Sequence, residues 1–178
     1  MPNNLLLTGP PGIGKTTIIR KVVQILGPRA GGFFTEEVRQ KGKRIGFRLV
    51  TLDGNVAWLA RANWPSHYRV GRYGVDVEAL EQVGVQAIWK VLVHNDVIIV
   101  DEIGRMELAS AAFVRAVDAA MDSSKPLVAT IMSKSHPTAT LFKSRSDVEL
   151  WTVTVDTRDR LPSRVLDWIT QRLPRQGT

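Results

Sequence analysis

The chain contains no cysteine and only three histidines among its 178 residues. Without cysteine, neither a disulfide framework nor a thiolate metal centre can form. The three histidines, His67, His94 and His136, lack the close spacing of metal-ligand pairs, so we expect packed or solvated side chains. No apolar run approaches the roughly 20 residues that span a bilayer, and the N-terminal MPNNLLLTGP lacks the basic region of a signal peptide. We therefore expect a cytoplasmic protein with no membrane segment.

The rest of the composition is that of an ordinary globular protein, with 44% hydrophobic and 23% charged residues. The sequence has no repeat, low-complexity segment or linker, and we expect residues 1–178 to form a single domain. The formal net charge is +7, and 16 of the 24 basic residues are arginines. A positive charge of this size favours anionic partners, whether nucleotides or nucleic acids, without choosing between them.

Short apolar runs alternate with stretches of helical period, which predicts an α/β protein with a mostly parallel sheet and helices on both faces. Strands are expected at 4–8, 97–101, 126–132 and 147–155. Helices are expected within 18–26, 77–92, 113–121 and 165–173. Residues 32–60, with turns at QKGKR and Asp53-Gly54, predict an antiparallel meander inserted into this scheme. Residues 62–74, rich in proline, glycine and arginine, predict a loop.

A phosphate-binding motif lies between the first expected strand and helix. GPPGIGKT, Gly9 to Thr16, fits G-x-x-x-x-G-K-[ST], in which glycines let backbone amides approach phosphate oxygens closely. Lys15 supplies a mobile charge at the β- and γ-phosphates, and the Thr16 hydroxyl is placed to bind Mg²⁺. The residues expected to contact the nucleotide are Gly9, Pro10, Pro11, Gly12, Ile13, Gly14, Lys15, Thr16 and Thr17.

The stretch VIIVDEIGRMEL, residues 97–108, runs from a buried-type strand directly into two acids. In a phosphate-loop protein the aspartate at the end of such a strand reaches the Mg²⁺ beside the threonine, so we expect Asp101 to be a metal ligand. Strand side chains alternate in direction, so Glu102 is free to orient or deprotonate an attacking water. The alternative for Glu102 is a solvated residue at the start of a loop.

Phosphoryl transfer also benefits from a cation at the γ-phosphate. Arg105, three residues beyond Glu102, is the arginine we assign to catalysis, with Arg69 and Arg72 as further candidates. Thr130 and Ser133 come at the end of the strand expected after the Asp-Glu strand, and either is a candidate for a hydrogen bond to the γ-phosphate or the water.

Five segments in this order resemble one family over nearly the whole chain: LLLTGPPGIGKTT, GGFFTEEVRQKGKRIGFRLVTLDG, RVGRYGV, VIIVDEIGRMEL and DVELWTVTVDTRDRLP. They are similar to the nucleoside-triphosphatase family of thermophilic prokaryotes, whose animal members are called cancer-related nucleoside triphosphatase. The resemblance implies a RecA-like phosphate-loop core and slow, Mg²⁺-dependent hydrolysis of ATP, GTP and other nucleoside triphosphates with loose base selectivity. It also implicates residues 9–16, Asp101 and Glu102. Many relatives have lysine where this chain has Arg105.

The residues themselves are also compatible with two other functions. A small-molecule or nucleotide kinase would transfer the γ-phosphoryl group to an acceptor, and the 62–74 loop would close over it. A nucleic-acid-dependent ATPase would use the positive charge, but the basic residues are scattered and the aromatic residues form no stacking series. We favour hydrolysis because an acid next to the magnesium aspartate suits activation of water. The sequence does not indicate the oligomeric state.

Overall fold

The computed structural model describes residues 1–174, and its central feature is a mixed β-sheet. Within those residues the sheet has nine strands: β1 (Asn4–Thr8), β2 (Ala30–Gln40), β3 (Lys43–Thr51), β4 (Val56–Ala62), β5 (Arg69–Val70), β6 (Tyr73–Val75), β7 (Val97–Ile103), β8 (Leu127–Ile131) and β9 (Val148–Thr152). Their spatial order is β5-β6-β4-β3-β2-β7-β8-β1-β9. The five strands from β2 to β9 in this order run parallel, and the other four continue the sheet with antiparallel pairing.

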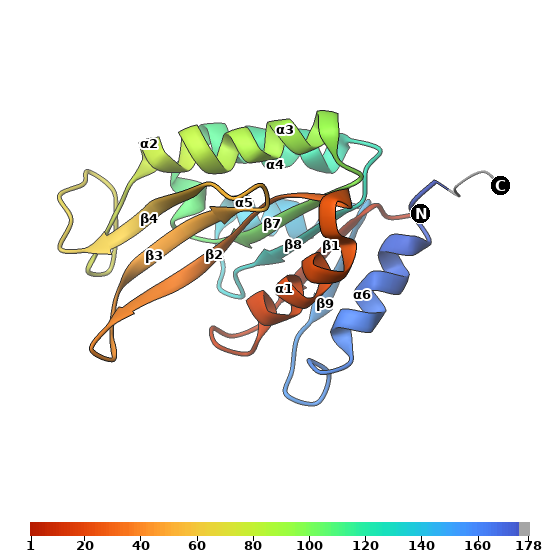
Figure 1. Ribbon diagram of the computed structural model, residues 1–178, viewed down its shortest axis with the longest axis horizontal. Coiled ribbons are helices and arrows are strands. Elements are labelled where there is room, and N and C mark those ends of the chain that lie inside the picture. Colours follow the sequence, from red (N-terminus) through yellow and green to blue (C-terminus); the bar gives the residue numbers. More distant parts are fainter. Residues whose placement is uncertain (175–178) are drawn as a thin grey trace.

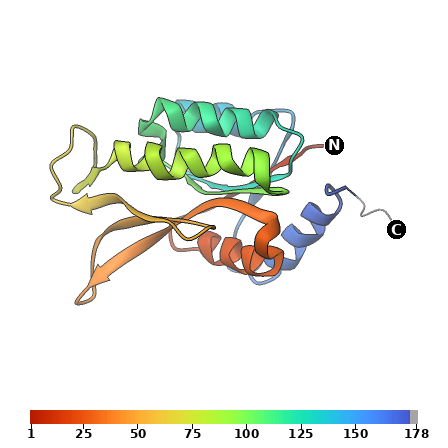
Figure 2. The same ribbon diagram turned by 45° about the horizontal axis from the view of Figure 1, so that its top comes forward.

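Helices cover both faces of the parallel part (Figures 1 and 2). The α-helices are α1 (Lys15–Leu26), α2 (Val77–Ala79), α3 (Gln86–His94), α4 (Ala111–Asp122), α5 (Pro137–Lys143) and α6 (Leu161–Thr170). A π-helical turn, Leu80–Val85, joins α2 to α3. Helices α1 and α6 pack on one face, and α3 and α4 pack on the other. The expected α/β architecture with helices on both faces is confirmed.

Each face has its own apolar cluster, which follows from the alternation of strand side chains. Leu5 and Leu7 of β1 face Ile19 of α1 and Val165 of α6, whereas Leu6 faces the opposite cluster. All five side chains are fully or almost fully buried. Because a strand buried on both faces must be apolar throughout, the uninterrupted LLL and VIIV runs mark the centre of the sheet.

The order β7-β8-β1 brings the ends of the two motif-bearing strands together. Parallel strands present their carboxyl ends at one edge, so the loop after β1 and the acids at the end of β7 lie at the same edge. Strand β8 lies between β7 and β1. A group on α1 therefore meets Asp101 across the end of β8.

The expected antiparallel meander is confirmed, and it is continuous with the parallel part of the sheet. Residues 30–34 of β2 pair in parallel with β7, and residues 33–40 pair in antiparallel fashion with β3. Strand β2 therefore belongs to both parts, and β3, β4, β6 and β5 extend the sheet beyond it. The β2–β3 turn projects away from the helices (Figure 2).

Other differences concern short or shifted elements. The expected loop at 62–74 contains most of a small hairpin, β5 and β6, whose turn uses Gly71 at φ +56°. Helix α5 has only seven residues and was not expected, because PTATLFK carries little apolar periodicity. Strand β9 ends at Thr152 rather than at 155, and α6 starts four residues before the expected helix. No helix within residues 1–174 is both long and apolar enough to cross a membrane.

Candidate nucleotide-binding and active site

The loop between β1 and α1 has the backbone form that phosphate binding requires. Gly9 packs closely against the chain after β9, where a Cβ atom would lie 2.9 Å from the Val153 carbonyl oxygen. Gly14 precedes α1 at φ +115°, a conformation that side chains disfavour. Because Gly14 has no side chain to cap the helix, the first N–H groups of α1 are left for a ligand, and the helix dipole favours an anion there.

Lys15 lies over this loop with its ammonium group at a fixed position. The side chain is largely buried, and Nζ donates hydrogen bonds to the Gly9 carbonyl oxygen at 2.8 Å and the Pro10 carbonyl oxygen at 3.2 Å. An ammonium has three donors, so one remains for a phosphate oxygen. This arrangement fits the role that the motif predicts for Lys15.

Asp101 and Thr16 are in direct contact, as the sequence predicts. The Thr16 hydroxyl donates to Asp101 Oδ2 at 2.9 Å, and the Thr130 hydroxyl donates to Oδ1 at 2.6 Å. Asp101 is fully buried. Burial raises the pKa of this carboxyl, and the two hydroxyl hydrogen bonds oppose the rise. Thr130 therefore holds Asp101 rather than facing outward, in contrast to the role expected for it at the γ-phosphate or the water.

Glu102 follows at the mouth of the site and is partly buried. The peptide bond between Asp101 and Glu102 is cis. Burial and the neighbouring Asp101 charge raise the pKa of Glu102, and the Lys15 charge opposes this shift. The charges of Lys15 and Asp101, which the sequence places near the γ-phosphate together with Glu102, therefore act on the Glu102 carboxyl.

Comparisons with known proteins identify the family of this chain. The family model described as NTPase matches residues 4–166. The chain belongs to this family. It is 46% identical over 162 residues to "Nucleoside-triphosphatase THEP1" of Thermotoga sp. (strain RQ2), which covers 91% of the chain and 92% of that protein. The THEP1 protein of Methanopyrus kandleri is 42% identical over 181 residues, which covers 97% of the chain and all of that protein.

Solved structures agree with this NTPase assignment. The crystal structure of THEP1 from Aquifex aeolicus has a TM-score of 0.87 at 35% identity, over 93% of this chain and 98% of that one. The solution structure of a human cancer-related nucleoside triphosphatase has a TM-score of 0.79 at 36% identity, over 95% and 98% of the two chains. The resemblance stated from the sequence is confirmed, and the fold is that of a phosphate-loop NTPase.

The oxygen atoms of this NTPase site suit a hard divalent cation. Mg²⁺ prefers oxygen ligands, and in nucleotide sites it takes one or two from the protein and the rest from phosphate and water. Thr16 Oγ1 and Asp101 Oδ2 supply two adjacent oxygens at the end of the phosphate loop. Within residues 1–174 there is no cluster of three or more acidic, histidine or cysteine side chains that could hold a metal by itself. The residues present therefore fit Mg²⁺ bound together with a nucleotide.

Glu107 is a buried acid that the sequence analysis missed. Its Oε2 accepts a hydrogen bond from the Gly104 backbone N–H at 3.1 Å. A Cβ atom on Gly104 would lie 2.8 Å from Glu102 Oε1 and 2.9 Å from Glu107 Oε2, so the two carboxyls meet around this glycine. Burial, followed by the Glu102 charge, raises the pKa of Glu107 to about 8. A third acid in DEIGRMEL has no local signal that distinguishes it from a solvated residue.

The candidate arginines of the NTPase fall into two groups. Arg69 donates to the Trp64 carbonyl oxygen at 2.9 Å and Arg72 to the Tyr73 hydroxyl at 3.2 Å, so both stabilise the β5–β6 hairpin. Arg105 is exposed in the turn after β7, where its carbonyl oxygen accepts a hydrogen bond from the Tyr68 hydroxyl. Its guanidinium forms no hydrogen bond or ion pair with any residue from 1 to 174, which leaves it available for an anionic ligand.

Proposed function

We propose that the chain hydrolyses nucleoside 5′-triphosphates to the diphosphate and phosphate, with Mg²⁺ and with loose base selectivity. The observation that carries this proposal is the contact between Thr16 and Asp101 beside the partly buried Glu102. It joins a phosphate-binding element to a carboxylate that can act on water. The names of the relatives, which specify a triphosphatase but no particular base, support the same activity.

In this proposal the backbone amides of the loop and Lys15 bind the β- and γ-phosphates. Thr16 and Asp101 hold Mg²⁺, which when bound neutralises charge on the phosphate oxygens. The hydrogen bond from Thr130 orients Asp101 for this task. These residues supply position and charge, which are the main contributions a protein makes to phosphoryl transfer.

Glu102 then orients the attacking water and accepts its proton. The water oxygen forms a bond to the γ-phosphorus, the bond from that phosphorus to the β–γ bridging oxygen breaks, and the diphosphate leaves with the bonding electrons. A carboxylate whose pKa is raised is a better proton acceptor than an ordinary one, provided that it is ionised at the working pH. Arg105 stabilises charge on the γ-phosphate from the adjacent turn.

The fate of the γ-phosphate tests this proposal. Purified protein is given Mg²⁺ and each of several nucleoside triphosphates, alone and with a mixture of nucleosides and monophosphates. We expect free phosphate from several triphosphates, unaffected by acceptors. Glu102→Gln should lower turnover by about 100-fold or more with nucleotide affinity nearly unchanged, because only the proton acceptor is removed. The exposed acid Glu78 provides the matched control, Glu78→Gln.

Three outcomes would each contradict a part of the proposal. Phosphate that accumulates on an acceptor in step with the diphosphate would make the chain a kinase. Full activity of Glu102→Gln would remove Glu102 from the mechanism while leaving the hydrolase assignment in place. Turnover that persists when Mg²⁺ is chelated would contradict the role given to Thr16 and Asp101.

A further inference from the structure

A hollow of about 320 Å³ adjoins the phosphate loop, and neither Asp101 nor Glu102 lines it. Its lining comes from the loop, from the first turns of α1 and from the segment between β9 and α6. The residues that matter for the argument are Gly12, Gly14, Thr17, Lys21, Arg158 and Asp159. The sequence analysis assigned Gly12, Gly14 and Thr17 to the nucleotide, whereas Lys21, Arg158 and Asp159 were not assigned to it.

The segment after β9 is fixed against the phosphate loop. The Val153 N–H donates to the Thr8 carbonyl oxygen at 2.7 Å, which continues the pairing of β9 with β1 up to the start of the loop. Arg158 Nη1 donates to the Ile13 carbonyl oxygen at 3.3 Å, and the stem of Arg158 lies beside Gly14. In Figure 1 this segment and the phosphate loop lie at the same end of the parallel strands. The hollow therefore has two fixed walls.

The two ends of the phosphate loop give a bound triphosphate its direction. Lys15, Asp101 and Glu102 define the γ-phosphate end, and neither carboxylate lines the hollow. Thr17 and Lys21 of α1 do line it. A triphosphate with its γ-phosphate at the carboxylates thus directs its α-phosphate, and the sugar attached to it, into the hollow. This step rests on the function proposed above.

The charges around the hollow suit a nucleoside better than a further phosphate. Arg158 is partly buried and has a planar guanidinium, which can stack on a base. Asp159 is exposed and forms no ion pair within residues 1–174. A carboxylate beside a triphosphate is repulsive unless it accepts hydrogen bonds from neutral donors, and a nucleoside offers hydroxyl and N–H donors.

We propose that this hollow is the nucleoside subsite, in which Arg158 stacks on the base and Asp159 accepts hydrogen bonds from the nucleoside. The subsite lies at the sheet edge beside the phosphate loop, and Arg158 and Asp159 of the segment that follows β9 form one of its walls. Its two residues determine how much tighter a nucleotide binds than a bare polyphosphate.

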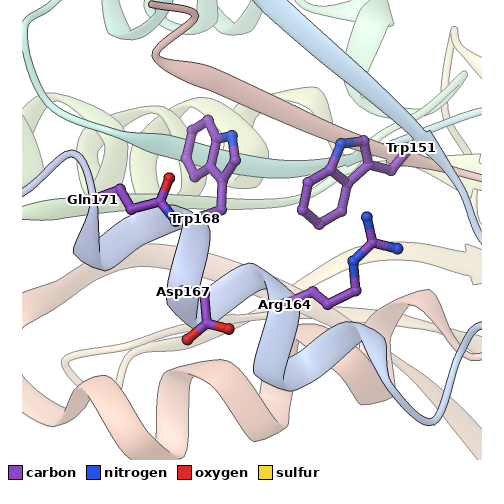
Figure 3. A pocket seen from close by; sticks show the side chains of 5 residues that line it. All are labelled: Trp151, Arg164, Asp167, Trp168 and Gln171. Atoms are coloured by element: carbon purple, nitrogen blue, oxygen red, sulfur yellow. The ribbon is translucent and has the colours of Figure 1, made fainter.

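A second hollow, of about 250 Å³, lies between β9 and α6 and contains two tryptophans (Figure 3). Both indole N–H groups donate to Glu149, from Trp151 at 3.3 Å and from Trp168 at 3.0 Å. The Arg164 guanidinium lies 4.7 Å from the Trp151 ring centre. This hollow shares no lining residue with the phosphate loop, so a triphosphate held by that loop does not place its base there.

Equilibrium binding measurements separate the contribution of the nucleoside to affinity from the contribution of the phosphates. The dissociation constants of β,γ-methylene ATP, β,γ-methylene GTP and inorganic tripolyphosphate are measured for the wild type, Arg158→Ala and Asp159→Ala. We expect each variant to reduce the preference for nucleotide over tripolyphosphate by about fivefold or more, the effect of one lost contact. The matched controls are Arg160→Ala and Asp156→Ala, which remove the same charges from the same segment outside the hollow. Binding of tripolyphosphate to each variant shows that its phosphate loop is folded.

The outcomes distinguish this inference from the proposed hydrolysis. An unchanged preference in both variants, or an equal change in the controls, would overturn the subsite even if the chain hydrolyses triphosphates. A wild type that binds nucleotide no tighter than tripolyphosphate would also overturn it. If Asp159→Ala no longer reduces the preference when the 2′-deoxy analogue is used, Asp159 accepts a hydrogen bond from the ribose. If the reduction differs between the ATP and GTP analogues, Asp159 contacts the base. Failure of hydrolysis with this preference intact would instead remove the proposed function and leave a nucleotide-binding protein.

Discussion

The parallel strands and the antiparallel strands of this sheet differ in how deeply their polar side chains are buried. At the end of the parallel strands, Asp101 and Thr130 are completely buried and hydrogen-bonded to each other. In the antiparallel extension, the paired charged groups remain partly or largely exposed to water. Arg44, for example, bonds to Glu37 and the Tyr73 hydroxyl and lies over the Phe47 ring.

The difference has an energetic consequence. Removing one partner of a buried polar pair leaves the other partner without water or a hydrogen bond, whereas an exposed partner is resolvated. The catalytic edge is thus sensitive to single substitutions, and the extension tolerates them. Four substitutions, ordered from the largest expected change in stability to the smallest, test whether this contrast holds.

Glu107, in the turn after β7, should give the largest change, and the change should depend on pH. Its pKa is raised from an ordinary 4.5 to about 8 in the folded protein. Between these values the native state keeps a proton that the unfolded state has released, so this group lowers the free energy of unfolding as pH rises. Glu107→Gln keeps an acceptor for the Gly104 N–H but does not ionise. Its gain in stability over the wild type should approach several kcal/mol by pH 9 and vanish near pH 4.

Urea unfolding at pH 4, 7 and 9 measures this difference. The control is Glu78→Gln on the exposed surface of α2, which should change stability by less than about 0.5 kcal/mol. A gain for Glu107→Gln that is the same at all three pH values would mean that the Glu107 carboxyl is not protonated in the native protein.

Thr130→Val removes a buried hydroxyl without a large change in shape. Asp101 then loses its shortest hydrogen bond, at 2.6 Å, in a position without access to water. We expect the free energy of unfolding to fall by about 2–3 kcal/mol. Turnover should also fall by about tenfold or more, because Asp101 is no longer held in place. Thr130→Ser, which keeps the hydroxyl, should recover most of the turnover, and equal losses in both variants would contradict the role of this hydrogen bond.

Tyr73→Phe is the corresponding loss of a hydroxyl in the antiparallel extension. The Tyr73 oxygen accepts hydrogen bonds from Arg44 at 2.9 Å and from Arg72 at 3.2 Å, and both arginines are near water. We expect a loss of about 1 kcal/mol in unfolding free energy and no change in turnover. Thermal unfolding and the phosphate-release assay, run beside Thr130→Val, make the comparison. A decrease in turnover for Tyr73→Phe would connect the extension to the active site.

The sequence could predict those features of the fold and the site that follow from local patterns. The phosphate loop, Lys15 and the Thr16–Asp101 contact follow from local motifs, and the apolar LLL and VIIV runs identify the central strands. The Thr130 hydrogen bond to Asp101 joins residues 29 positions apart on neighbouring strands, so its direction depends on the order β7-β8-β1. No local pattern contains that order.

Other features escaped prediction because their cause is also non-local. The turns around β3 predict antiparallel hairpins, but the parallel pairing of residues 30–34 with β7 depends on a strand more than 60 residues away. The burial of Glu107 depends on how the turn after β7 packs, and Arg158 comes to the phosphate loop only because β9 pairs with β1. The roles of Glu102 and Arg105 remain predictions, and the turnover of Glu102→Gln tests the first of them.

Arg39→Ala should have the smallest effect of the four. Arg39 bonds to Glu37 at 3.0 Å on the outer part of the β2–β3 hairpin, where the two side chains are 56% and 41% exposed. Water and salt screen such a pair, and ordering two long side chains opposes the attraction, so the expected loss is below about 0.5 kcal/mol. Urea unfolding at low and high salt measures it, and the small loss should shrink further at high salt. A loss as large as that of Thr130→Val would show that the extension, despite its exposed charges, is as sensitive as the catalytic edge.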